Sequence, residues 1–136
     1  MTGQRTEQNK AVVLRLYEAF NAGDPDALDT LVAENLINHN PWMPDGRAAA
    51  QAALRQLGTM QVELHQIIAD GDLVAVHAHY KTPADGAGMD FYKVKDGQIV
   101  EHWDVRQDIP GTTASGHDMF SDLTSSSQDQ PGPASR

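Results

Sequence analysis

The stretch DGQIVEHWDVRQDIP, from Asp96 to Pro110, combines a tight turn with a long strand that carries chemically active side chains. Asp-Gly is a strong signal for a β-hairpin, because glycine takes a positive φ angle at no steric cost. Val, Ile and Trp suit a half-buried pleated surface, whereas His102, Asp104 and Gln107 are groups that a sheet protein places in solvent or in a site. We therefore predict that part of this strand lines a pocket.

Three more strands are expected before this one, each bounded by a turn signal. The alternating pattern predicts strands over 61–69, 73–82, 89–95 and 98–108. Asp70-Gly71-Asp72 and Asp96-Gly97 supply hairpin turns, so the strands form an antiparallel meander.

The first half of the chain has a helical rhythm instead. Apolar residues recur at three- and four-residue steps before Gly23, and they are Val12, Val13, Leu16, Tyr17 and Phe20. Asp24-Pro25 starts a second short helix, with Leu28, Leu31 and Val32 facing inward. A loop over 38–46 and a third helix over 48–57 follow. The fold class expected is α+β, a cone-shaped roll in which N-terminal helices pack on a curved antiparallel sheet around a cavity.

Length and composition set the class of protein. We expect one domain over 1–120 and a disordered tail over 121–136, which is rich in Ser, Gln, Pro and Gly. Zero cysteines exclude disulfides, thiolate metal sites and a cysteine nucleophile. A formal charge of −9 repels a phosphate backbone, so nucleic acid is not an expected partner. The chain has neither a membrane-spanning run nor a secretory signal pattern, which predicts a cytoplasmic protein without a membrane partner.

Residues two apart on a strand share a side, which allows the faces to be sorted. On the last strand Trp103 and Gln107 share one side, opposite His102, Asp104 and Arg106. A side that bears His, Asp and Arg is more easily read as exposed. We therefore expect Trp103 and Gln107 to line the cavity and to contact a ligand.

The preceding strands carry further candidates. Asp90 shares its side with Tyr92 and Val94 and is expected to point inward, where a buried carboxylate is a natural general acid or base. His77 and His79 share a side that is either a solvated outer face, a dimer interface or part of the site. Among the aromatic residues Trp42 is expected to be a lid, and Tyr17 either a packed helix residue or a ligand contact. His65, which alternates with Glu63, is most simply a surface residue.

These motifs also carry a resemblance to a known family. The order HNPWMPDG, HxH, DFYKVKDGQIVEHWDVRQDIP and HDMF resembles the SnoaL-like family, in particular its aldol-condensation branch, within the nuclear transport factor 2-like superfamily. The resemblance spans 9–120. It implies a cone-shaped α+β barrel, commonly a homodimer, that binds an apolar or polyketide-like molecule without a metal or an organic cofactor.

In the polyketide cyclases of that family an aspartate four residues after the strand tryptophan is the acid/base. Here the position holds Gln107, which cannot exchange a proton usefully. Either the chemistry has moved to Asp90, which would remove the α-proton of a carbonyl compound, or the cyclase activity is absent. His39 and His79 would donate hydrogen bonds to the enolate oxygen. The function expected is a cofactor-independent cyclase or isomerase of the lyase or isomerase class.

Other interpretations stay open at this point. A non-catalytic protein that binds an apolar small molecule, or an epoxide hydrolase of the same fold, would suit the same cavity. His77 and His79, together with His39 and Asp90, would supply three imidazoles and one carboxylate, a set able to hold zinc or iron if all four converged. We expect no metal.

Overall fold

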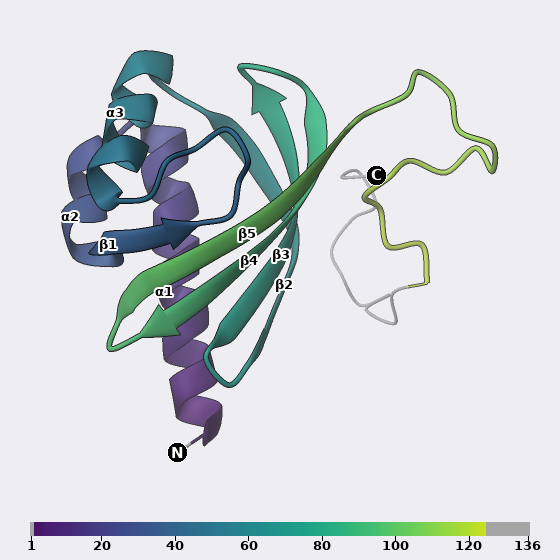
Figure 1. Cartoon of the computed structure of the whole chain (residues 1–136). Coiled ribbons are helices and arrows are strands. Elements are labelled where there is room, and N and C mark those ends of the chain that lie inside the picture. Colours follow the sequence, from purple (N-terminus) through teal and green to yellow (C-terminus); the bar gives the residue numbers. More distant parts are fainter. Residues whose placement is uncertain (1, 125–136) are drawn as a thin grey trace.

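The computed structural model describes residues 2–124, which fold into helices on one side of a curved sheet (Figure 1). The long helix α1 (Thr2–Ala22) comes first, followed by the 3₁₀ turn η1 (Pro25–Ala27) and the short helix α2 (Leu28–Leu31). Helix α3 (Arg47–Leu57) lies later in the chain. Together the helices cover the concave face of the sheet, which confirms the predicted α+β fold class.

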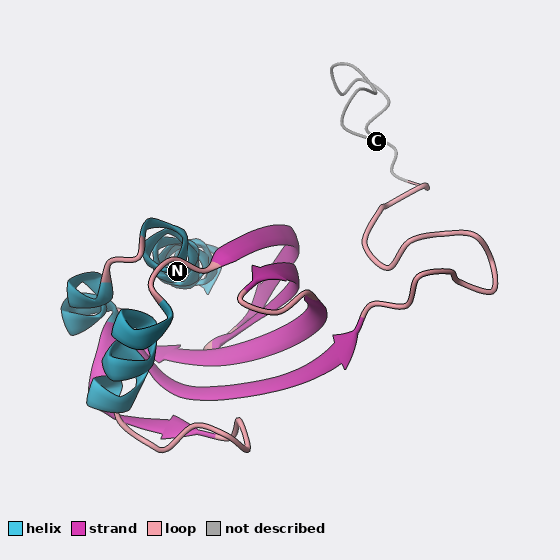
Figure 2. Cartoon of the chain, turned by 90° about the horizontal axis from the view of Figure 1, so that it is seen from above, coloured by secondary structure: helices cyan, strands magenta, loops and turns pink. Residues whose placement is uncertain are grey.

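The sheet has five strands in the order β1-β5-β4-β3-β2. They are β1 (Val32–Asn38), β2 (Gln61–Asp70), β3 (Leu73–Thr82), β4 (Gly86–Lys95) and β5 (Gln98–Asp108). β2 to β5 pair as the predicted antiparallel meander. Viewed from above, the sheet bends around the helices without closing into a barrel (Figure 2).

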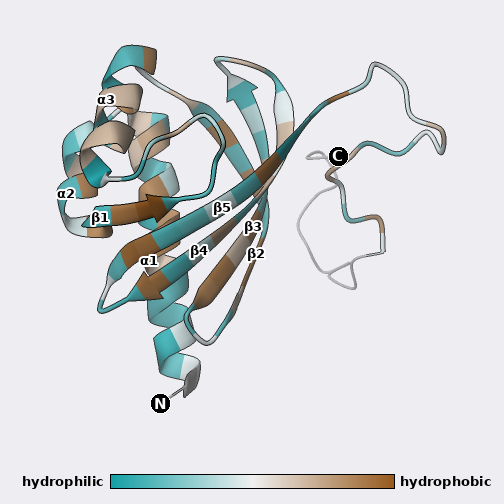
Figure 3. Cartoon of the chain, viewed as in Figure 1, coloured by the Kyte–Doolittle hydropathy of each residue, from teal (hydrophilic) through white to brown (hydrophobic). Residues whose placement is uncertain are grey.

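Strand β1 departs from the expectation, because the sequence pattern predicts Val32 in the second helix and no strand before the loop over 38–46. Helix α2 ends at Leu31, and the chain continues as an edge strand that pairs parallel to β5, with Val32 opposite Ile99 and Asn38 opposite His102. The sheet is therefore mixed rather than purely antiparallel. The partner strand β5 is distant from β1 in the sequence, so local patterning could not reveal the pairing. Figure 3 shows that β1 carries hydrophobic residues.

The core lies between the helices and the concave face of the sheet. Its fully buried side chains include Val13 and Tyr17 of α1 and Val74, Val76 and Val94 of the sheet. Residues of β3 and β4 alternate between this face and the outer one, which is why the valines of β3 lie inside while its histidines lie outside.

After β5 the chain turns back, and Phe120 stacks on histidine rings of β2 and β3 on the outer face. The predicted disordered tail starts at 121, and most of it, 125–136, lies outside the described residues. Among the described residues no helix is both long and apolar enough to cross a membrane.

Candidate active site

A pocket of about 360 Å³ opens between the helices and the concave face of the sheet. Its wall is apolar and comes mainly from the helices, with Leu16, Phe20, Leu28, Leu54, Leu57 and Met60 among its residues. The opposite end is polar and is formed by β3, β4, β5 and the loop after β1. Its polar residues are Asn38, Asn40, Tyr80, Asp90, Tyr92, His102, Asp104 and Arg106. The pocket thus joins an apolar chamber to a cluster of ionisable groups.

Asp90 is the centre of the polar end and is completely buried. Its Oδ1 lies 2.8 Å from Nε2 of His102 and 3.9 Å from Nη2 of Arg106, while its Oδ2 accepts a hydrogen bond of 2.5 Å from the hydroxyl of Tyr80. A buried carboxylate without partners is costly, so three partners on β3 and β5 account for its presence in the core.

The position of the protons on His102 follows from its neighbours. Oδ1 of Asn38 accepts the backbone N–H of Asn40 at 3.0 Å, which identifies that atom as oxygen. The same oxygen lies 3.2 Å from Nδ1 of His102, so Nδ1 must carry a proton. One further proton then lies between Nε2 of His102 and Oδ1 of Asp90. The pair either exists as imidazolium and carboxylate or as neutral imidazole and carboxylic acid, and moving one proton converts the two.

Tyr80 is the last member of a chain of phenols. The hydroxyl of Tyr17 lies 3.0 Å from that of Tyr80 and 2.7 Å from that of Tyr92. Because Tyr80 gives its single proton to a carboxylate, Tyr17 must donate to Tyr80, and Tyr92 must donate to Tyr17. When Asp90 is ionised, all three O–H groups therefore point along one path toward its carboxylate, and each hydrogen bond strengthens the next.

Burial raises the pKa of all three phenols well above the ordinary value, and the negative charge of Asp90 raises each further. They therefore stay protonated and act as donors over the physiological pH range. Burial by itself lowers the pKa of the Arg106 guanidinium, but Tyr80, Asp90 and Asp104 outweigh that effect and raise it above the ordinary value. Arg106 is therefore a permanent positive charge beside the pocket.

Asp104 forms a second carboxylate next to the first. Nε of Arg106 lies 3.3 Å from its Oδ2, and the amide Nδ2 of Asn40 lies 3.0 Å from both of its oxygens. The Arg106 guanidinium also lies over the Tyr80 ring, 3.6 Å from its centroid. Arg106 is thus held between two carboxylates and a ring face, an orientation that depends on its planar group.

The HNPWMPDG loop places Asn40 through its own backbone. Oδ1 of Asn40 accepts the N–H of Trp42 at 2.8 Å, so the amide nitrogen has to face Asp104. Asp45 accepts the N–H of Asn38 at 2.8 Å and closes the loop. Trp42 itself is 84% exposed and is one of the residues that line the pocket, and its role as a lid stays a prediction.

The structure reverses the assignment of faces on β5. His102, Asp104 and Arg106 line the pocket, whereas Gln107 is exposed and Trp103 lies on the outer face, where its ring stacks on His39. The expectation that Trp103 and Gln107 contact a ligand in the cavity is therefore wrong. The physical reason is that each charged side chain finds a partner across the sheet or in the loop after β1, which makes a charged face toward the helices possible.

The expected catalytic residues do not all meet. Asp90 lies inward as expected, but His39 pairs with Glu101 on the outer side at 2.7 Å. His77 and His79 also lie on the outer face of β3, so the four-residue metal set built on them with His39 and Asp90 does not form. Tyr17 is a packed helix residue that touches Tyr80 rather than the pocket.

The residues that sequence reasoning missed are Asn38, Asn40, Tyr80, His102, Asp104 and Arg106. Alternation had separated the two sides of β5 correctly, but it carried no information on which side faces the helices. Asp104 sits directly opposite Asp90 only because the register shifts between Lys93 and Val94, and regular extension of the Asp96-Gly97 turn would have placed Trp103 there, so no local signal gave this pairing. Asp90, His102 and Asp104 also bring their ligand atoms within 4.8 Å of one another, which makes them a group able to hold a metal ion.

The fold is shared with NTF2-like proteins of known structure. More narrowly, the chain belongs to the SnoaL-like domain family, whose model matches residues 13–102. No curated protein matches the sequence.

Solved structures with this fold are described with different activities. A candidate ketosteroid isomerase from Kribbella flavida is 21% identical over 85% of this chain and 97% of its own, with a TM-score of 0.70. An LEH-like epoxide hydrolase from M. tuberculosis is 20% identical over 76% and 85%, with a TM-score of 0.65. IdmH, a candidate polyketide cyclase from Streptomyces antibioticus, is 25% identical over 74% and 92%, with a TM-score of 0.60. These likenesses establish the fold and leave the reaction to be argued from the site.

Proposed function

We propose that this protein is a cofactor-independent enzyme that performs acid/base chemistry on a small or polyketide-like carbonyl compound. The observation that carries the proposal is the 2.8 Å hydrogen bond between the fully buried Asp90 and the half-buried His102 at the polar end of an apolar pocket. A proton can move between the two side chains of such a pair without changing the net charge of the core. An inert container for apolar molecules would be better without it.

In the proposed reaction Asp90 removes a proton from the carbon next to the substrate carbonyl. The C–H bond breaks, its electron pair forms an enolate, and the proton moves to the carboxylate. Arg106 and the amide of Asn40 lie at the same end of the pocket and supply the positive charge and the donor that an enolate oxygen requires. They replace His39 and His79 in that role. Return of the proton at another carbon gives an isomer, and attack of the enolate on a second carbonyl carbon gives an aldol ring.

The test is exchange of α-protons for deuterium in D₂O, followed by NMR over a panel of small ketones and polyketide-like diketones. Asp90→Asn should lower the exchange rate about 10²- to 10⁴-fold while ligand affinity is largely retained. Asp85→Asn, which removes an exposed carboxylate from the outer face, is the matched control and should exchange at the wild-type rate. If Asp90→Asn changes affinity alone, a non-catalytic binding protein is the better description. If the wild type exchanges none of the panel faster than buffer does, the proposal fails.

One observation favours a second candidate, an epoxide hydrolase. Arg106 lies between Asp90 and Asp104, and the amide of Asn40 donates a hydrogen bond to Asp104. This arrangement of donors and acceptors is suited to holding a water molecule. Asp104 would take a proton from water, whose oxygen attacks an epoxide carbon. The C–O bond then breaks, and the epoxide oxygen takes the proton of Asp90. Incorporation of ¹⁸O from labelled water into a diol, abolished in Asp104→Asn, would support this reaction over proton exchange.

We also propose that the protein is a homodimer. The outer face of the sheet carries exposed apolar side chains, including Leu73, Met89, Phe91 and Val105, which a second copy would cover. Gel filtration with light scattering gives the mass directly, and a monomer at micromolar concentration would contradict the proposal. A cytoplasmic location stays a prediction.

A further inference from the structure

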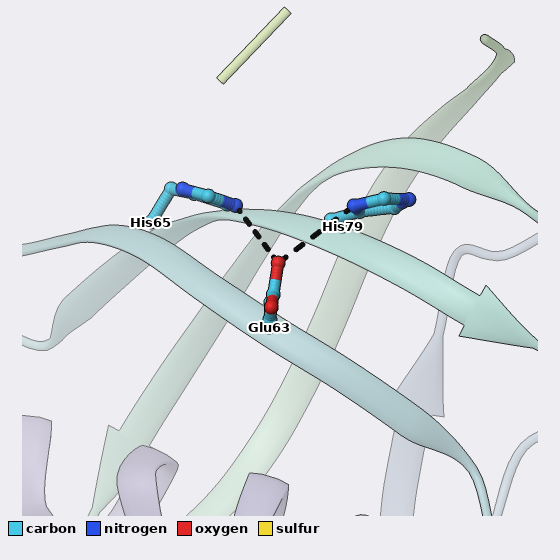
Figure 4. A group of neighbouring side chains, drawn as sticks. All are labelled: Glu63, His65 and His79. Carbon is cyan, nitrogen blue, oxygen red and sulfur yellow. Dashed lines mark ion pairs between the residues drawn. The ribbon is translucent and has the colours of Figure 1, made fainter. Parts of the chain in front are cut away.

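A second group of ionisable side chains lies on the opposite face of the sheet from the pocket. Oε1 of Glu63 lies 3.5 Å from Nε2 of His65 and 3.8 Å from Nδ1 of His79, and the three ligand atoms all fall within 4.8 Å of one another (Figure 4). Both distances exceed ordinary hydrogen-bond lengths. They approach the roughly 3.4 Å that separates ligand atoms around a tetrahedral zinc ion with bonds of about 2.1 Å.

The backbone places these three residues. Glu63 of β2 sits directly opposite His79 of β3 in the antiparallel register. The register shifts between Leu64 and Gln66, so His65 is the extra residue of a β-bulge. A bulge re-aims a side chain, and here the His65 ring is turned toward Glu63. Two rigid strands therefore hold the group together.

His79 is oriented by a carboxylate on its far side. Its Nε2 lies 2.7 Å from Oδ1 of Asp85. An ionised carboxylate only accepts hydrogen bonds, so Nε2 carries the proton, and in the neutral ring Nδ1 then offers a lone pair toward Glu63. Metal-binding histidines commonly have such a carboxylate partner, which fixes the tautomer and makes the ring more basic.

Phe120 covers the group. Its ring stacks on those of His65 and His79, with centroids 4.8 and 4.7 Å apart and interplanar angles of 21° and 11°. The turn that presents Phe120 is held by Asp118, whose carboxylate accepts the backbone N–H groups of Phe120 and Ser121 at 2.7 Å each. The Phe120 ring lies against the faces of the two imidazoles, whereas their nitrogen atoms lie at the ring edges.

We propose that Glu63, His65 and His79 form a zinc-binding site on the outer face, with Asp85 as the residue that positions His79. Two imidazoles and one carboxylate are a known zinc ligand set, and water would complete the tetrahedron. Nζ of Lys81 donates a hydrogen bond of 2.9 Å to Oε2 of Glu63, which leaves Oε1 of Glu63 for the metal. The site is separate from the acid/base pocket, and it does not depend on the function proposed above.

The experiment is a calorimetric titration of untagged full-length protein with ZnCl₂, with zinc-edge anomalous diffraction to locate the ion. We expect one equivalent to bind at this site. His65→Gln and His79→Gln should each weaken binding at least tenfold, and Asp85→Asn about 10- to 100-fold. His77→Gln is the matched control, because His77 lies on the same face and also contacts Phe120 but is not a ligand; it should bind zinc as the wild type does.

Two results would overturn the proposal. One is the absence of zinc binding in a wild-type protein whose circular dichroism spectrum is that of a folded chain. The other is binding that is lost in His102→Gln but kept in His65→Gln, because the ion would then lie with Asp90 and Asp104 in the pocket. Circular dichroism of every variant separates loss of a ligand from loss of the fold.

Discussion

The phenolic oxygen of Tyr17, on helix α1, lies 2.7 Å from that of Tyr92, on strand β4. With Tyr80 these residues are all three tyrosines of the chain, and all of them are buried. The contact ties the long helix to the strand that carries Asp90. Helix packing and the arrangement of the proposed active site are therefore coupled through one path of hydroxyl groups.

The tyrosines predict a specific alkaline behaviour. Their pKa values are raised in the folded state by burial and by Asp90, so their contribution to stability is present below the ordinary value of 10.0 and is lost as the pH rises above it. We expect no tyrosinate absorbance at 295 nm at pH 10 while the protein is folded, and titration near the ordinary value in concentrated urea. Tyrosinate formation at pH 10 with an unchanged circular dichroism spectrum would contradict the buried path.

Tyr17→Phe tests the middle of that path. It removes the donor to Tyr80 and the acceptor for Tyr92 while keeping the ring, so we expect a loss of about 1–3 kcal/mol in the free energy of unfolding measured in urea. Tyr92→Phe removes only the terminal donor and should cost less. Equal losses in the two variants would mean that Tyr17 does not bridge Tyr80 and Tyr92.

Gly88 makes room for the stacked pair of Arg106 and Tyr80. A Cβ atom at this position would lie 2.7 Å from Cε2 of Tyr80 and 3.1 Å from Cδ and Nε of Arg106. We expect Gly88→Ala to lower the free energy of unfolding by about 1–3 kcal/mol and to reduce activity, because Arg106 has to move. Gly86→Ala on the same strand is the control, since its nearest contact is an ordinary 3.4 Å. A fully active Gly88→Ala protein would show that the position of Arg106 is unimportant.

Gln107→Asp tests the assignment of faces on β5. The change restores the aspartate that the resemblance to polyketide cyclases suggests, but the side chain is exposed and faces away from the pocket. We expect no gain in proton exchange and a stability within about 0.5 kcal/mol of the wild type. A large gain in exchange in the NMR assay would show that β5 presents its other face to the substrate.

Much of the fold could be predicted from local signals. The apolar stripe of α1, the Asp-Gly turns and the alternation in β2 to β5 are short-range patterns, and the α+β class follows from their order. Strand β1 was missed because its pairing with β5 joins residues far apart in the chain, and its sequence is too short to separate a strand from the end of a helix.

The amino-acid sequence by itself determined which residues share a side of each strand, because alternation is a property of the extended backbone. It also singled out Asp90 as the carboxylate that points inward, since Tyr92 and Val94 share its side. Only the tertiary structure decided which side of β5 faces the helices and which histidines meet. Alternation cannot make that choice, because His102, Asp104 and Arg106 are tolerated inside only where Asp90, Asn40 and Tyr80 arrive from other strands and loops to satisfy their charges.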